Sequence, residues 1–362
     1  MSSPRKLRVG VIGTGGFAEI CHIPGLQSHP AAEVVAVCGR RQGAARALAD
    51  RFGIRWAMDD YHELCAHPEI DAVTIVTANV AHASQAIEAL RHGKHVFCEK
   101  PLAMTVAEAR EMTRVAADSG KVHQVAFTFR YNYGVRDLRR RVAAGDIGMP
   151  FFARSQFDRW DGLTPGWTAG WREKKEFAGA GMLFDMGVHL FDIHRHVLGP
   201  ISSVIGYNEV IPRHVPDKLT GVMTSVETDD LTNAWLRHSN GIRGQFFLSR
   251  VTPPFALPGF LEVVGTEGAL KAALNRGGED TIKVSSPSAS EWRDLPLSPE
   301  AADGQPHALG LMMRSFVDAC LRGEIDPTID ASFDDGLAAQ VAMTALMESQ
   351  ETGCWTRLDV AD

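Results

Sequence analysis

The sequence predicts an α/β protein with two domains: an N-terminal doubly wound parallel sheet, and a C-terminal α+β domain with an open, mainly antiparallel sheet. Three observations support this prediction. Short β-branched runs alternate with helical segments up to about residue 128, as in a parallel sheet. A glycine-rich turn follows the first run. Beyond that point, strand patterns follow one another with few helices between them. We therefore expect domains at 1–128 and 129–362.

Composition and charge exclude several classes of protein. The 362 residues carry a formal net charge of −7, which gives no support for binding nucleic acid or an anionic membrane surface. The six cysteines are scattered without a C-x-x-C pair, so we expect neither a disulfide framework nor a metal site. The N-terminus is too short and polar for a signal peptide, and no apolar run reaches transmembrane length. We expect a cytoplasmic protein.

The first strand pattern, at residues 8–12, ends in the sequence GTGGFA, which fits G-x-G-x-x-G/A. Gly13 can make the tight turn after the strand, Gly15 lets a pyrophosphate approach the backbone, and Ala18 lets the next helix lie close to the strand. The start of that helix would direct its N–H groups at the phosphates. The alternative is a turn that merely needs glycine. The residues expected to line this dinucleotide site are Gly13, Gly15, Gly16, Phe17 and Ala18.

The second strand pattern, at 33–39, bears on cofactor choice. An acidic residue usually ends this strand in an NAD site and binds the ribose hydroxyls. This chain has Gly39, Arg40 and Arg41 there, and two guanidiniums can pair with a 2′-phosphate. We therefore expect NADP(H) to be favoured over NAD(H). The alternative is that the arginines are solvated and the enzyme uses NAD without an acid.

Two further strands end in polar motifs, at the sheet edge where ligands of open α/β sheets bind. The strand at 70–77 runs into Thr77, Asn79 and His82, which could contact the cofactor, although Asn79 could equally be a helix cap. The strand at 94–101 ends in Glu99-Lys100-Pro101. The proline holds Lys100 out of the helical region, and its ammonium could bind a substrate hydroxyl and stabilise an alkoxide. The alternative is a surface Lys-Pro turn.

Hydrophobic periodicity predicts the other elements of this half. We expect helices at 44–52, 61–66, 83–92 and 106–119, and strands at 55–57 and 121–129.

In the second half, residues 182–198 predict a helix with a polar stripe. Asp185, His189, Asp192 and His196 fall on one helical face, among apolar neighbours. His189 is a suitable general base because its ordinary pKa lies near neutrality, and Asp185 could orient it or contact substrate. The alternatives are polar residues satisfied in the core, a solvated face, or a metal site.

The loop at 160–177 is rich in aromatic residues. Trp faces can stack on sugars and Arg172 can bind hydroxyls or a carboxylate, so Trp167, Trp171 and Arg172 are candidate substrate contacts. Such residues can also pin a long loop to its own core or to a partner subunit.

The remaining elements of the second half are mostly strands. We expect helices at 133–144, 307–322 and 333–348, a loop at 285–304, and strands at 151–158, 204–211, 231–238, 241–251 and 260–265. Ser239-Asn240-Gly241 predicts a hairpin, and residues 263–270 predict a second one. The helix at 182–198 can cover one face of this sheet. The other face could pair with a second copy, so we expect a homodimer or homotetramer through the C-terminal sheet.

Five ordered motifs resemble those of the Gfo/Idh/MocA family, the glucose–fructose oxidoreductase and inositol dehydrogenase group. They are GTGGFA, TANVAH, CEKP, FTFRYN and GAGMLFDMGVHLFD. The resemblance implies a Rossmann domain followed by an open antiparallel-sheet domain. It further implies that Lys100, Asp185 and His189 are catalytic. The expected cofactor contacts are then Thr77, Asn79, His82, Glu99 and Lys100, in addition to the Arg40 and Arg41 expected from the end of the second strand. Arg130 of FTFRYN is a further candidate substrate contact.

The chain departs from the family pattern at three places. Ala78 stands where proline is usual and Ala180 where glycine is common, and neither change touches a reacting group. The pair Arg40-Arg41 departs from the acidic form of NAD-using members.

The expected function is an NAD(P)-dependent oxidoreductase that transfers hydride between nicotinamide and a secondary alcohol or ketone of a sugar, cyclitol or related polyol. His189 would be the acid/base and Lys100 would bind the reacting oxygen. One alternative is a lyase or glycosidase with a tightly bound, recycling NAD. Another is a non-catalytic dinucleotide-binding sensor, which would need none of Lys100, Asp185 and His189.

Overall fold

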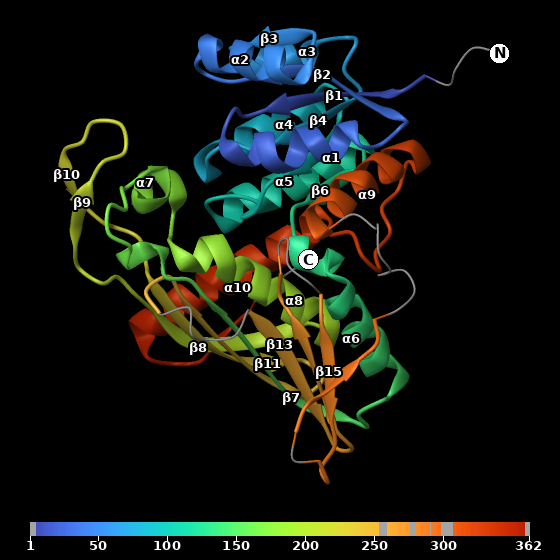
Figure 1. Ribbon diagram of the computed structural model, residues 1–362, viewed down its shortest axis with the longest axis vertical. Helices are drawn as coiled ribbons and strands as arrows, with labels where there is room; N and C mark the ends of the chain where they lie inside the picture. Colours follow the sequence, from blue (N-terminus) through green and yellow to red (C-terminus); the bar gives the residue numbers. More distant parts are fainter. Residues whose placement is uncertain (1–4, 253–258, 276–279, 290, 298–306, 359–362) are drawn as a thin grey trace. The chain divides into compact units, whose positions relative to one another are not determined.

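The computed structural model describes residues 5–252, 259–275, 280–289, 291–297 and 307–358. The chain forms two compact units (Figure 1). Unit 1 comprises residues 1–127 and 309–337, and unit 2 comprises residues 128–308 and 338–362. Within the described ranges, no helix is long and apolar enough to cross a membrane.

Unit 1 is built on a six-stranded parallel sheet. Its order is β3-β2-β1-β4-β5-β6, the order of a doubly wound dinucleotide-binding fold. The prediction of this fold is therefore confirmed. The strands are β1 (Leu7–Ile12), β2 (Ala32–Cys38), β3 (Trp56–Met58), β4 (Ala72–Ile75), β5 (His95–Cys98) and β6 (His123–Val125).

Helices cover both faces of this sheet (Figure 1). They are α1 (Ile23–Gln27), α2 (Gln42–Phe52), α3 (Tyr61–Ala66), α4 (His82–Arg91), α5 (Val106–Ser119) and α9 (Ala308–Arg322). A π-turn, Ala18–His22, precedes α1. The late helix α9 packs into unit 1, because Phe316 meets Phe97 of β5 with ring centroids 5.4 Å apart. Sequence periodicity predicts α9 but does not indicate that it returns to the first unit.

Unit 2 is built on a nine-stranded sheet of order β16-β15-β14-β13-β7-β12-β11-β8-β17. All neighbours are antiparallel except β7 and β12, which run parallel. The strands are β7 (Pro150–Asp158), β8 (Ile201–Glu209), β11 (Leu231–His238), β12 (Arg243–Ser249), β13 (Phe260–Gly265), β14 (Ala269–Ala273), β15 (Ile282–Ser285), β16 (Arg293–Leu295) and β17 (Thr356–Arg357). Both predicted hairpins are present, as β11–β12 and β13–β14.

The prediction of a loop at 285–304 was wrong in part, because β16 lies within it and pairs with β15. The pairing satisfies backbone groups that a loop would leave to solvent. Residues 290 and 298–304 of that predicted loop lie outside the described residues. A separate two-stranded ribbon joins β9 (His214–Pro216) and β10 (Met223–Ser225).

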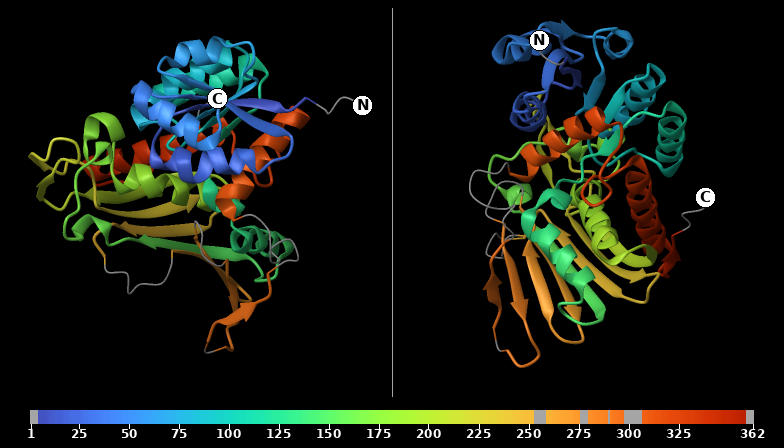
Figure 2. Two further views of the ribbon diagram at one scale, coloured as in Figure 1. Left: turned by 45° about the horizontal axis from the view of Figure 1, so that its top comes forward. Right: turned by 90° about the vertical axis from the view of Figure 1, so that its right-hand side faces the viewer.

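One face of the nine-stranded sheet is covered by α6 (Tyr133–Ala144), α8 (Val188–Leu198) and α10 (Phe333–Thr352) (Figure 2). On α8, Phe191 packs edge-on against Phe246 of β12 at 4.9 Å, and His194 shares a 3.0 Å hydrogen bond with Ser155 of β7. The opposite face carries Tyr207 and Trp235, which are 46% and 44% exposed. The predicted role of the 182–198 segment as a cover for one face is thus confirmed.

Candidate active site

The glycine turn after β1 has the geometry that a dinucleotide requires. Gly13 has a φ of +127°, and a Cβ at this position would lie 2.4 Å from the Val76 carbonyl oxygen, so only glycine fits. A Cβ on Gly15 or Gly16 would meet no protein atom within 4 Å. Both glycines are exposed, at the start of a helical segment that continues through α1. This open backbone at a helix N-terminus fits a pyrophosphate.

Ala18 is fully buried, and its N–H donates to the Gly15 carbonyl at 3.0 Å. This agrees with the expectation that a small residue here lets the helix pack on the strand. Phe17 is half-buried beside His22, with ring centroids 5.8 Å apart.

The end of β2 presents cations rather than carboxylates of its own. Arg40 and Arg41 are exposed directly after Gly39, where a Cβ would lie 2.5 Å from Thr14 Cγ2. Burial, with smaller contributions from the nearby carboxylates of Asp60 and Asp59, raises the pKa of the Cys38 thiol to about 12. The two carboxylates that act on Cys38 most strongly therefore follow β3 rather than β2.

Hydrogen bonds within unit 1 fix the segment after β4, residues 77–82. Thr77 Oγ1 donates to Gln85 Oε1 at 2.8 Å, and Asn79 is buried. His82 is fully buried, with Nδ1 2.8 Å from the Pro101 carbonyl and Nε2 3.3 Å from the Thr77 carbonyl. Burial lowers the pKa of His82, so its neutral ring donates from one nitrogen at a time. His82 thus ties the loop after β4 to the loop that carries Lys100.

Lys100 follows a buried hydrogen-bonded pair, His22 and Glu99, that sequence analysis did not find. His22 Nε2 lies 3.1 Å from Glu99 Oε1, and Glu99 Oε2 accepts from the Lys100 backbone N–H at 3.3 Å. Burial alone would raise the pKa of Glu99, but the His22 hydrogen bond and the charges of His22 and Lys100 bring it below its usual range. Glu99 and His22 are buried, while Lys100 is partly exposed and precedes a cis bond to Pro101.

In unit 2, the predicted helix at 182–198 is present, but its first turn is a π-turn, Leu183–Gly187. Asp185 lies in this turn, and its Oδ2 is 3.1 Å from Arg159 Nη1. His189 follows in α8, only 1% exposed, with its ring centroid 5.0 Å from that of Phe129. Arg159, directly after β7, was not among the predicted residues, because no local pattern links it to Asp185.

Asp192 shows how the polar stripe is satisfied. Its carboxylate binds Arg130 in a buried two-point pair, with Nε 2.9 Å from Oδ2 and Nη2 2.5 Å from Oδ1. Both residues are 2% exposed. For Asp192, the interpretation as a core-satisfied polar residue therefore holds, and Arg130 sits in the interior of unit 2.

The aromatic loop at 160–177 is fastened by arginines. Trp167 packs against two guanidiniums, with its ring centroid 5.0 Å from Cζ of Arg213 and 5.4 Å from Cζ of Arg250. Arg250 is itself buried, and it donates to Asp230 at 2.6 Å and to Glu173 at 3.0 Å. The alternative that Trp167 pins the loop to its own core therefore has direct structural support.

The other two candidate contacts of this loop stack on each other. The Arg172 guanidinium lies 4.4 Å from the centre of the Trp171 ring, and both side chains are half-buried or exposed.

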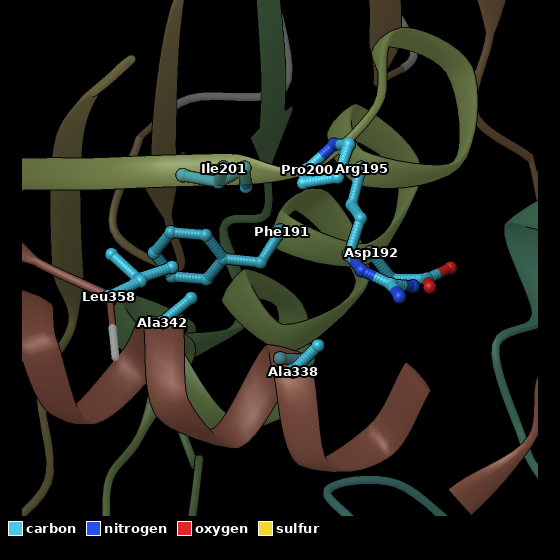
Figure 3. Close-up of a pocket in the computed structure, with 9 residues that line it drawn as sticks. Phe191, Asp192, Arg195, Pro200, Ile201, Ala338, Ala342 and Leu358 are labelled. Atoms are coloured by element: carbon cyan, nitrogen blue, oxygen red, sulfur yellow. The ribbon is translucent and has the colours of Figure 1, made fainter. Parts of the chain in front are cut away.

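Across the described ranges, no group of three or more His, Cys, Asp or Glu could hold a metal ion. A cavity of about 30 Å³ lies between α8, α10 and the start of β8 (Figure 3). It has room for about two water molecules and is walled mainly by apolar side chains such as Phe191 and Ile201.

Comparison with known proteins identifies the family. A family model described as "Oxidoreductase family, NAD-binding Rossmann fold" matches residues 7–127, and one described as "GFO/IDH/MocA C-terminal domain" matches residues 135–271. The chain is 28% identical over 359 residues to scyllo-inositol 2-dehydrogenase (NAD(+)) of Bacillus subtilis, covering 98% of this chain and 97% of that protein. It is 32% identical over 292 residues to 1,5-anhydro-D-fructose reductase of Ensifer adhaerens, covering 81% and 83% of the two chains.

Solved structures agree. Levoglucosan dehydrogenase in complex with NADH and levoglucosan superposes with a TM-score of 0.88 at 26% identity, covering 98% of this chain and 100% of that one. The matched models span more than half of the sequence, and they join a nucleotide-binding unit to the sheet-rich unit with the predicted topology. The chain therefore belongs to the Gfo/Idh/MocA oxidoreductases, with an NAD-binding Rossmann domain at its N-terminus.

Proposed function

We propose that the chain interconverts a secondary alcohol and a ketone on a sugar, cyclitol or related polyol, with a nicotinamide dinucleotide as the redox partner. The observation that carries this proposal is that each unit presents one set of residues suited to the reaction. Unit 1 offers an open glycine cradle and a partly exposed Lys100 at the same edge of its sheet. Unit 2 offers Asp185 and His189 one turn apart on a helix. Relatives named for inositol, levoglucosan and anhydrofructose support a polyol substrate.

The dinucleotide, held by the backbone of Gly13, Gly15 and Gly16, supplies the hydride acceptor or donor. His189 takes the hydroxyl proton in oxidation and returns it in reduction. The Lys100 ammonium binds the reacting oxygen and stabilises its developing negative charge. Asp185, whose carboxylate is paired with Arg159, binds a neighbouring hydroxyl or orients His189.

Three side chains of the aromatic loop complete the proposal. Trp171 and Arg172 act as one stacked unit that contacts the substrate, which gives it an apolar surface and a cation together. Trp167 packs against the guanidiniums of Arg213 and Arg250 and so fixes the shape of the loop. Arg130 is buried with little exposed surface, and it supports α8 through its ion pair with Asp192.

We further propose that NADP(H) is favoured over NAD(H). The support is the exposed pair Arg40 and Arg41 at the end of β2, where two guanidiniums can bind a 2′-phosphate.

We also propose that the chain assembles as a homodimer or homotetramer through the C-terminal sheet. The support is the row of large side chains on the face opposite α8, where Phe152 and Trp235 lie 6.3 Å apart.

The test is a screen of sugars and cyclitols with NAD and NADP, read as absorbance of the reduced nicotinamide. On the best substrate, Lys100→Met and His189→Ala should each lower kcat by about 100-fold or more, while the dissociation constant of the cofactor stays near that of the wild type. Lys283→Met and His92→Ala, at exposed polar contacts with Asp294 and Glu88, are the matched controls and should keep the wild-type rate. Wild-type turnover in both active-site variants would remove the mechanism. Turnover without net reduction of added cofactor would instead favour a lyase or glycosidase with a recycling dinucleotide.

A further inference from the structure

Asp229 holds three consecutive backbone amides at the start of the helix that carries Asp185 and His189. Its Oδ1 accepts from Gly181 N–H at 2.6 Å and its Oδ2 from Leu183 N–H at 2.8 Å. Its backbone carbonyl accepts from Met182 N–H at 3.0 Å. The first amides of a helix have no partner within the helix, so they need acceptors from outside. Here one residue, nearly fifty positions later in the chain, supplies all three.

The approach of Asp229 to this turn is as close as the backbone allows. A Cβ on Gly181 would lie 2.1 Å from the Asp229 carbonyl oxygen, so a side chain there would displace one segment or the other. Asp229 is 5% exposed, and the buried Thr232 hydroxyl also donates to its Oδ2 at 3.3 Å. A buried carboxylate that accepts several hydrogen bonds fixes its donors firmly, because releasing any of them leaves a polar group unsatisfied.

The segment that Asp229 holds leads directly into the π-turn. In this turn the Val188 N–H donates to the Leu183 carbonyl, five residues back, rather than four as in an α-helix. The wider turn changes the angle between side chains before and after it. Asp185 lies inside the turn and His189 is the second residue after it. The start of the turn therefore sets how these two side chains are oriented relative to each other.

We propose that Asp229 is a positioning residue for the reaction: by holding the amides of residues 181–183, it keeps the π-turn in register so that Asp185 and His189 reach the substrate together. The proposal rests on the proposed function for its catalytic consequence. It assigns Asp229 no contact with substrate or cofactor. Its effect passes through the geometry of the helix start.

The test compares Asp229→Asn with Asp330→Asn. The asparagine at 229 keeps the size of the side chain but turns an NH₂ group toward an N–H donor. Asp330 is the matched control: it is 1% exposed and accepts from Ser315 Oγ at 2.6 Å and from Asp326 N–H at 2.9 Å, in unit 1. Both substitutions should lower the melting temperature. Only Asp229→Asn should lower kcat, by about 10- to 100-fold, with KM and the cofactor dissociation constant within about twofold of the wild type.

Hydrogen exchange supplies a readout that does not depend on activity. The amides of residues 181–183 should exchange about tenfold faster or more in Asp229→Asn than in the wild type or in Asp330→Asn. Unchanged exchange at these amides, or an equal loss of kcat in the two variants, would overturn the proposal. A wild-type chain that turns over no substrate in the screen refutes the proposed function, while the exchange result still decides whether Asp229 holds the turn.

If Asp229→Asn does not fold, the variant Thr232→Val tests the proposal instead. This nearly isosteric change removes only the hydroxyl hydrogen bond to Asp229. It should lower kcat about fivefold and speed exchange at residues 181–183 by a similar factor, since one hydrogen bond contributes about 1 kcal/mol. Wild-type values of both quantities in Thr232→Val would overturn the proposal.

Discussion

Replacing Arg130 with methionine should destabilise unit 2 strongly and leave substrate affinity almost unchanged. The guanidinium and the Asp192 carboxylate are each 2% exposed and make a two-point pair, with Nε 2.9 Å from Oδ2 and Nη2 2.5 Å from Oδ1. Without Arg130, the carboxylate stays buried without its cation. Breaking a buried pair in this way costs about 3–5 kcal/mol. At about 2–4 °C per kcal/mol for a domain of this size, the melting temperature should fall by roughly 6–20 °C.

The assay is a thermal melt together with steady-state kinetics measured well below the transition. Arg130→Met should keep a KM near that of the wild type. The double variant Arg130→Met/Asp192→Leu should recover much of the lost stability, because an apolar pair of similar volume often replaces a buried ion pair at little cost. Asp192→Leu alone removes the carboxylate that balances the buried guanidinium and should destabilise about as strongly as Arg130→Met. A variant Arg130→Met that melts like the wild type but has a greatly raised KM would refute this reasoning and identify Arg130 as a substrate contact.

Three further outcomes can be measured. Arg40→Ala should weaken NADP(H) binding more than NAD(H) binding in a fluorescence titration, and equal effects would count against a 2′-phosphate site. Burial, and to a lesser extent the neighbouring His238, lowers the pKa of His194 from its ordinary 6.5 to about 3. The unfolded chain therefore binds a proton that the folded chain does not, and between pH 6.5 and 3 the free energy of unfolding should fall by up to about 1.4 kcal/mol per pH unit as the pH is lowered. His194→Gln should flatten this slope in urea titrations, and an unchanged slope would exclude His194 as its source. Trp235→Asp should shift the chain toward the monomer in sedimentation, whereas an unchanged assembly would place the interface elsewhere.

Much of the fold follows from local pattern. The bounds of α3, α5, α6, β11 and β13 agree residue for residue with the predicted ones. These segments have clear periodicity and strong boundaries, such as the capping box between Thr105 and Glu108 at the start of α5. The strand order of unit 1 follows from the alternation of strands and helices and the preference for right-handed crossovers.

Other features depend on residues far apart in the sequence. The return of α9 to unit 1 depends on a close fit between Gly25 and Met313, where a Cβ on the glycine would lie 2.7 Å from the methionine side chain. The residues of the π-turn are as apolar as those of an ordinary helical turn, so hydrophobic periodicity in the sequence cannot distinguish the two kinds of turn.

The candidate site divides in the same way. Gly13, Lys100 and His189 stand in motifs that can be recognised locally. Their supports, such as His22 beneath Glu99 and Arg159 beside Asp185, come from other elements, and no spacing in the sequence links the partners. Long-range hydrogen bonds of this kind cannot be predicted from the periodicity of the sequence.

The neighbouring carboxylates Asp229 and Asp230 serve different parts of unit 2. The first holds the amides of 181–183, and the second binds Arg250 and Arg213, the two cations that contact the Trp167 ring. Mutations in the tryptophan loop and mutations at the helix start should therefore show epistasis, because both are transmitted to adjacent peptide units. A library designed to widen the substrate range would best hold this acidic dipeptide constant and vary Trp171 and Arg172, whose stacking partner lies within the loop itself.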